Sequence, residues 1–276
     1  MQKQPQHIAD ISPKSTQICR WIIIVNIVFN GAFSNNISAQ NLSIDWGKSW
    51  GSMQKESGNL LKKDSYGNMY LAGVFDKSFT YMISNIEYKV TSKGSNDIFF
   101  AKLNVNGELV YMQSIGGADN DVLQDMDVDA AGNVYLCGNF LNAISLGSTD
   151  SAAYHSQGET DFFVAKYNTK GDCLFARTFG DFGDDICKNI RIDTDGNIFI
   201  SGFFTEKIGF NKKTDQVVNI YARGFNDVFL VKLNKDGDAK WARNYRPNTE
   251  VQSLSMDVDK LGSVFLAGVY LSLIHI

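Results

Sequence analysis

Short runs of apolar, aromatic and β-branched residues alternate along most of the chain with turns rich in Gly, Asn and Asp. No stretch shows the 3.6-residue apolar period of an amphipathic helix. Short runs bounded by turn residues are typical of β-strands. In one representative stretch they cover residues 123–129, 134–140, 161–167 and 174–179. The pattern therefore predicts an all-β protein.

The runs recur in a repeat that three separate markers share. The first marker is a turn and strand, with glycines spaced 65, 64 and 66 residues apart at Gly67, Gly132, Gly196 and Gly262. The second marker is an Asp-led strand at residues 97–103, 161–167 and 227–233. The third is an aromatic strand at residues 46–50, 111–115, 175–179 and 241–245. Three markers in one order at one period indicate a repeat architecture.

Four strands in each period of about 65 residues are typical of a propeller blade. We expect a β-propeller fragment of about three and a half four-stranded antiparallel blades. The aromatic strand should fill the wedge between blades, and small residues followed by glycine should allow close approach between sheets. These small residues are Ala72, Cys137, Ser201 and Ala267. The units are residues 46–110, 111–174, 175–240 and 241–270, within a propeller region of residues 40–270.

The phase of the repeat predicts a ring that closes on its own first strand. Residues 46–50 match the last strand of a unit, and the fourth unit stops after its second strand. Residues 271–276 break the pattern and can be back-translated as CTGTCTCTTATACACATC, which looks like a transposon-end adapter. We therefore expect a truncated chain whose last six residues are not native.

The first 39 residues resemble an export signal. Basic residues precede an apolar run at residues 21–33, and a small-residue cleavage site follows before Gln40. The apolar run is too short to span a bilayer comfortably, so we expect no integral membrane segment after cleavage; an uncleaved anchor is the alternative. The location predicted is secreted or cell surface. Cleavage would move the formal net charge from −4 to −6, because three positive charges and one negative charge leave. An acidic surface argues against a nucleic-acid partner.

The repeat resembles the SBBP family, a propeller repeat of bacterial exported proteins. The matching core is Asp-x-x-Gly-Asn-h-Tyr-h-x-Gly-x-Phe, at residues 64–75, 129–140 and 193–204. A Gly-Gly-x-x-x-Asp loop at residues 116–121 also matches, whereas Arg246-Pro247 replaces the double glycine before the fourth unit, so that loop is expected to differ. The resemblance implies an exported module of a longer surface protein and implies no catalytic residue.

Acidic loops between the units are the candidate ligand sites. Asp119 and Asp121 lie in one loop and Asp181, Asp184 and Asp185 in the next. If these loops converge at the channel mouth, they could hold calcium or another divalent cation, or bind a cationic ligand; the alternative is that they are solvated acidic loops. The turn at residues 193–197 resembles the start of an EF-hand loop but has the wrong order, and a hairpin turn explains it.

Other chemistry is weakly signalled. His155 is the only histidine between the signal and the tail, and no nucleophile pattern accompanies it. Cys137, Cys173 and Cys187 form no CxxC pair and are expected to be structural. We expect a non-enzymatic module without a catalytic site or cofactor, which binds a protein or glycan or acts as a spacer. The alternative is a polysaccharide hydrolase or lyase with its site in the channel.

Overall fold

The computed structural model describes a chain built from β-strands. The described residues are 22–30, 41–50, 56–147, 153–210, 217–223, 226–246, 251–260 and 262–270. Within these ranges the chain forms eighteen strands and no helix, which confirms the predicted all-β class. Among these residues there is accordingly no helix long and apolar enough to cross a membrane.

Three four-stranded antiparallel sheets form the body of the molecule. The first sheet contains β3 (Glu56–Lys63), β4 (Met69–Ile83), β5 (Ile86–Leu103) and β6 (Leu109–Ile115). The second contains β7 (Val122–Val128), β8 (Val134–Ile144), β9 (Tyr154–Tyr167) and β10 (Cys173–Phe179). The third contains β11 (Asp185–Ile192), β12 (Ile198–Phe204), β15 (Asp227–Leu233) and β16 (Ala239–Tyr245). Each sheet follows chain order, as the repeat predicted.

The remaining strands form three two-stranded pairs. In the third sheet the connection between β12 and β15 carries a small hairpin of β13 (Lys207–Phe210) and β14 (Val218–Tyr221). The fourth unit contributes β17 (Val251–Val258) and β18 (Val264–Tyr270). Near the amino terminus β1 (Ile22–Asn30) pairs with β2 (Asn41–Trp50), which contains the predicted strand 46–50.

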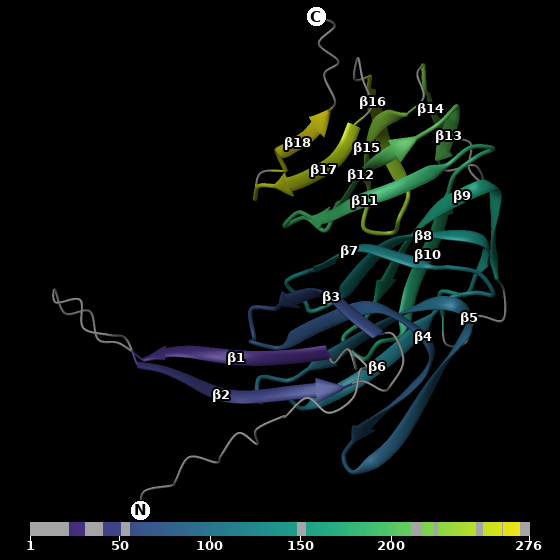
Figure 1. Cartoon of the computed structure of the whole chain (residues 1–276). Helices are drawn as coiled ribbons and strands as arrows, with labels where there is room; N and C mark the ends of the chain where they lie inside the picture. The colour runs from purple at the N-terminus through teal and green to yellow at the C-terminus, as the bar shows by residue number, and fades with distance from the viewer. Residues whose placement is uncertain are drawn as a thin grey trace, which may run out of the picture.

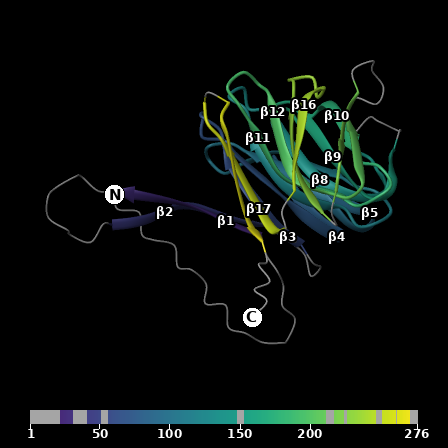
Figure 2. The ribbon, with the colours of Figure 1, turned by 90° about the horizontal axis from the view of Figure 1, so that it is seen from above.

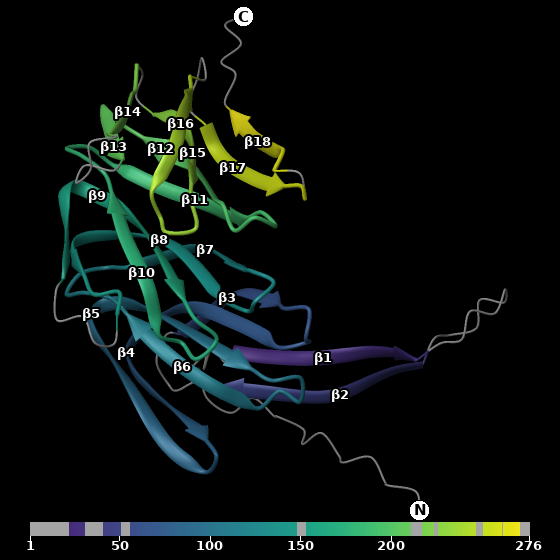
Figure 3. The same cartoon turned by 180° about the vertical axis from the view of Figure 1, so that it is seen from behind.

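The sheets stack face to face in chain order, from the first sheet to the β17–β18 pair (Figures 1 and 3). Hydrophobic clusters lie between consecutive sheets. One joins the first and second sheets through residues such as Phe100 and Phe163, and a second joins the second and third sheets through Phe162 and Phe229. Phe199 and Met256 belong to a third cluster, which lies between the third sheet and β17. A single sheet cannot bury both of its faces, so this stacking supplies the core.

The first strands of the sheets lie next to one another along one side of the stack. β3 contacts β7, β7 contacts β11, and β11 contacts β17. Figure 2 shows β11 and β17 side by side. We call β3, β7, β11 and β17 the inner row, because first strands surround the axis in a propeller.

Glycines in the second strand of each sheet allow close approach to the first strand of the same sheet, whereas the expectation was close approach between sheets. A Cβ atom at Gly73, Gly138 or Gly202 would overlap a backbone carbonyl oxygen of the first strand. In each sheet a β-bulge in the first strand lies at this position. Only glycine leaves room for the bulge.

The Asp-x-x-Gly-Asn turns close the first hairpin of each unit. The Oδ1 atom of Asp64 accepts the amides of Tyr66 and Asn68, both at 2.9 Å, and Gly67 has a φ of +88°. Asp193 accepts the amide of Asn197 at 2.8 Å in the same way. These carboxylates are occupied by their own backbone, as the hairpin-turn interpretation of residues 193–197 predicted.

The predicted wedge of aromatic side chains is confirmed in the first two sheets. Tyr111, Ile115 and Phe179 are buried, and Phe175 is partly buried. Tyr245, the counterpart of Phe179 in the third sheet, is 50% exposed, so its predicted burial is wrong. The reason lies in the next unit, because Phe210 of β13 covers Phe179 with a ring separation of 5.2 Å. The described part of the fourth unit, β17 and β18, contains no counterpart of β13.

The two terminal predictions are not tested. The cleavage site at residues 37–39 and the suspected adapter tail at residues 271–276 lie outside the described residues.

Candidate functional site

A buried aspartate begins the inner part of the third strand in each complete sheet. Asp97, Asp161 and Asp227 are each 1% exposed. Each accepts, through Oδ2, the backbone amide of the residue four positions earlier, at 3.0, 3.1 and 3.2 Å. Those residues are Lys93, Gln157 and Arg223. The aspartate therefore fixes the loop that enters the strand, and we call it the brace aspartate.

In the first two sheets a glycine lies directly over the brace aspartate. A Cβ atom at Gly116 would overlap the carboxyl group of Asp97, and a Cβ atom at Gly180 would overlap that of Asp161. Both glycines follow the last strand of their sheet. We call these two sites the closed loops, because the backbone passes too near the carboxylate for any side chain.

The third sheet carries Arg246 at the position of Gly116 and Gly180, directly after β16. An open recess of about 470 Å³ lies beside its brace aspartate. The lining is mainly polar and comes from β14, the following loop, β15 and β16. It consists of Asn219, Ile220, Tyr221, Arg223, Asp227, Asn244 and Arg246. This volume is within the usual range for small-molecule sites.

Hydrogen bonds fix the floor of the recess. Asn244 donates through Nδ2 to the carbonyl oxygen of Tyr221 at 3.1 Å and to Oδ2 of Asp227 at 3.2 Å. The Oδ1 atom of Asp227 is buried and has no hydrogen-bond partner among the described residues. A buried oxygen of this kind is costly unless something donates to it. The equivalent Oδ1 atom of Asp97, in a closed loop, is buried in the same way, so this oxygen is a feature of the brace aspartate and is not specific to the recess.

The walls of the recess are exposed and cationic. Arg223 and Arg246 are both exposed, and neither forms an ion pair with a carboxylate among the described residues. Tyr221 is 59% exposed, so its ring is available for contact. The recess can therefore accept a ligand that carries a negative group and hydrogen-bonding groups.

The predicted acidic loops are not simply solvated. Asp121 and Asp185 are buried, and their Oδ2 atoms accept the amides of Gly117 at 2.6 Å and Asp181 at 2.8 Å. Asp119 instead accepts the exposed amide of Asn142 at 2.9 Å. In the next loop Asp184 accepts the amide of Thr160 at 3.3 Å. Asp121 and Asp185 therefore order their own loops, whereas Asp119 and Asp184 join their loops to β8 and β9.

Burial raises the pKa of Asp121 to about 7. The amide of Gly117 opposes this shift, and the nearby Asp97 and Asp119 carboxylates add to it. Burial raises the pKa of Asp97 as well. No group of three or more His, Cys, Asp or Glu side chains in the described residues is arranged to hold a metal ion. Calcium at Asp119, Asp121, Asp184 and Asp185 stays an untested prediction.

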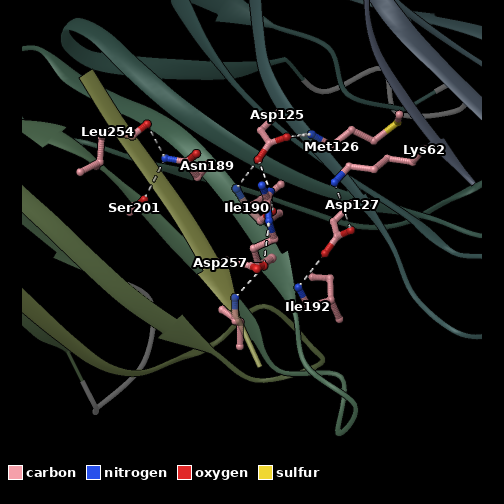
Figure 4. A network of polar contacts seen from close by, with 12 residues as sticks. Lys62, Asp125, Met126, Asp127, Asn189, Ile190, Ile192, Ser201, Leu254 and Asp257 are labelled. Atoms are coloured by element: carbon pink, nitrogen blue, oxygen red, sulfur yellow. Dashed lines mark hydrogen bonds and ion pairs between the residues drawn. The ribbon is translucent and has the colours of Figure 1, made fainter. Parts of the chain in front are cut away.

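The inner row is joined by polar side chains that span neighbouring strands (Figure 4). Asp125 of β7 accepts the amide of Ile190 at 3.1 Å and also pairs with Arg191 of β11. Asp127 accepts the amide of Ile192 at 2.9 Å. Each of these bonds joins residues 65 positions apart, so the repeat sets the register of the row.

The same arrangement continues around the row. Asn189 donates to the carbonyl oxygen of Leu254 at 3.2 Å, and Lys62 lies 3.8 Å from Asp127. The carboxylates of the inner row are therefore engaged in holding the sheets together. The sequence did not reveal this network, although the spacing of the aspartates contained the signal.

The remaining candidates have structural surroundings. Cys137 and Cys187 are buried next to each other. Burial raises the pKa of Cys137, and the neighbouring thiol of Cys187 adds to this shift. Cys173 is partly buried, and the three cysteines are free. His155 is exposed within β9, opposite Ala143.

Comparison with known proteins supports the fold. The chain is 22% identical over 199 residues to an uncharacterized WD repeat-containing protein, L264, of Acanthamoeba polyphaga mimivirus. It is 21% identical over 162 residues to the regulatory protein FlaEY of Caulobacter vibrioides. These regions cover 63% and 59% of this chain but only 14% and 17% of the two relatives. No family model matches the chain, so the SBBP resemblance stays an expectation. Stacked four-stranded sheets and a WD-repeat relative together indicate a propeller-like repeat fold.

Proposed function

We propose that the chain is a ligand-binding propeller module of an exported or cell-surface protein, and that the recess beside the third sheet is its binding site. The observation that carries this proposal is the local departure from the repeat. Two sheets close their brace aspartate with glycine, whereas the third leaves Asp227 beside an open recess. A module that served only as a spacer would not need this opening.

Two further observations favour binding over catalysis. Among the described lining residues Asp227 is the only carboxylate, and glycoside hydrolysis ordinarily uses two. In the inner row, where a channel site would lie, Asp125 and Asp127 are held by backbone amides and cations. The relatives are compatible with an interaction role, because WD-repeat propellers present loops on a rigid scaffold.

Array binding with the full chain tests the proposal. The labelled protein is applied to a glycan array and to a peptide array, beside the variant Asn244→Ala. We expect specific binding that Asn244→Ala weakens, because that variant removes the bonds to Tyr221 and Asp227. The matched control is Lys240→Ala, an exposed residue of β16 outside the recess.

Two results would contradict the proposal. The first is binding that survives Asn244→Ala unchanged in a folded protein, or no binding on either array. The second is release of new reducing or unsaturated ends from polysaccharides, which would favour the enzymatic alternative. Export is tested separately by fractionation and amino-terminal sequencing, with Gln40 expected as the mature terminus.

A further inference from the structure

The recess contains a combination of groups that specifies one class of ligand. Two exposed guanidinium groups, Arg223 and Arg246, line it, and neither pairs with a described carboxylate. The floor carries the buried carboxylate of Asp227 and the amide of Asn244. From this combination we infer that the recess binds an acidic saccharide, one whose sugar carries a carboxylate. This inference rests on the proposed binding function and names its ligand.

The two arginines account for the acidic group. The formal net charge of the chain is −4, so free cationic side chains gathered in one recess run against its overall charge. An arginine presents a planar fork that matches a carboxylate with two parallel hydrogen bonds. Such a contact is stronger than one between neutral groups, and it is selective for planar anions.

The other sheets show that the cationic wall is specific to this recess. At the position of Arg223 the first sheet has Lys93, whose Nζ donates to the carbonyl oxygen of Gly116 at 3.4 Å. The second sheet has the neutral Gln157 at this position. At the position of Arg246 both have glycine. Only the third sheet combines two guanidinium groups with an opening.

The floor of the recess and the ring of Tyr221 favour a sugar as the remainder of the ligand. Sugar hydroxyl groups donate and accept hydrogen bonds at once, which suits a polar lining that includes Asn219 and Asn244. Tyr221 is 59% exposed and presents an aromatic face, on which the C–H side of a sugar ring can pack. Apolar lining is limited to Ile220 and Tyr221, whereas peptide-binding grooves use pockets for apolar anchors. The lining therefore favours a saccharide over an acidic peptide.

Calorimetric titration of the full chain tests the inference with three probes. These are a trisaccharide of galacturonic acid, the neutral galactose trisaccharide of the same linkage, and a tri-glutamate peptide. We expect the acidic trisaccharide to bind most tightly, with an affinity that falls as salt is added, because exposed ion pairs are screened. Arg246→Gly and Arg223→Gln, which install the residues of the second sheet, should each weaken binding roughly 10- to 100-fold.

The controls distinguish a failure of the acidic-saccharide inference from a failure of the proposed binding function. Lys240→Gln removes a cation of β16 outside the recess and should leave the affinity unchanged. Thermal melting of each variant checks that the fold is intact. If the neutral trisaccharide binds equally well and Asn244→Ala abolishes its binding, the acidic-ligand inference fails while the binding function stands. Tighter binding of tri-glutamate overturns the saccharide in favour of a peptide. If none of the probes or array ligands binds, both proposals fail.

Discussion

The closed loops of the first two sheets and the open recess of the third start from the same structural plan. Each has a brace aspartate that is 1% exposed and accepts the amide four residues before it. They differ in the residue after the last strand, which is Gly116 or Gly180 in the closed loops and Arg246 in the open one. One residue per repeat thus separates a loop closed by glycine from a loop that borders an open recess.

This difference shows how a repeat protein can acquire a site without changing its scaffold. The strands, turns and inter-sheet cores repeat in all three sheets, because stacking requires each of them. The loop at the end of the last strand is freer to vary, since it contributes little to that stacking. The departure from the repeat is therefore a better guide to function than the repeat itself.

The largest expected difference between the two regions is in the stability lost when the aromatic side chain at the end of the last strand, Phe179 or Tyr245, is removed. Phe179 is 5% exposed and its ring lies 5.3 Å from Phe162 and 5.2 Å from Phe210. Phe179→Ala should lower the free energy of unfolding by about 3–5 kcal/mol. Tyr245→Ala should cost less than about 1 kcal/mol, because Tyr245 is half exposed. Urea denaturation measures both, and equal losses would show that the third sheet is closed like the others.

Exchanging the residues at the loop itself should give the next largest effect. Gly180→Arg places a Cβ atom into the carboxyl group of Asp161 and should cost about 3 kcal/mol, as overpacking does. The reverse change, Arg246→Gly, should cost less than about 1 kcal/mol, chiefly through greater freedom of the unfolded chain. Gly180→Ala tests whether the Cβ atom alone is responsible. If Gly180→Arg melts at the wild-type temperature, the loop is not closed.

The comparison also shows what the sequence could and could not predict. Periodic spacing predicted the sheets, their turns and the burial of residues such as Tyr111, because these depend on local pattern and stacking. The replacement at Arg246 was visible as a break in the repeat. The partners Asn219 and Arg223 were not, because they lie in a segment without a marker. The burial of Asp121 was missed as well, since it depends on how the loop folds back onto Asp97.

The closed loop of the first sheet should also carry a pH dependence that a single substitution removes. The pKa of Asp121 is about 7 in the folded chain against an ordinary value of 3.8. The folded state therefore binds the proton more tightly, and stability falls as pH rises from about 4 to about 7. Between pH 5 and pH 8 this amounts to about 2–3 kcal/mol.

Asp121→Asn should flatten this part of the pH profile, because an amide does not ionise. Its free energy of unfolding should decline less than that of the wild type between pH 5 and pH 8. Glu108→Gln is the matched control, since Glu108 is an exposed carboxylate in the turn between β5 and β6 that accepts the side-chain amide of Asn104. Denaturation curves at both pH values supply the comparison, and parallel profiles for wild type and Asp121→Asn would refute the assignment.

The smallest expected effect is on stability, and it compares Lys93, beside a closed loop, with Arg223, beside the open recess. Lys93 donates to the carbonyl oxygen of Gly116 at 3.4 Å, and its charge lowers the pKa values of Asp97 and Asp121. Lys93→Ala should therefore cost about 0.5 kcal/mol at pH 8 and less at pH 5, where Asp121 is protonated. Arg223→Ala should change stability by less than this at either pH, because Arg223 pairs with no described carboxylate. A loss for Arg223→Ala that matched Lys93→Ala and grew with pH would mean that Arg223 serves its own brace aspartate instead of a ligand.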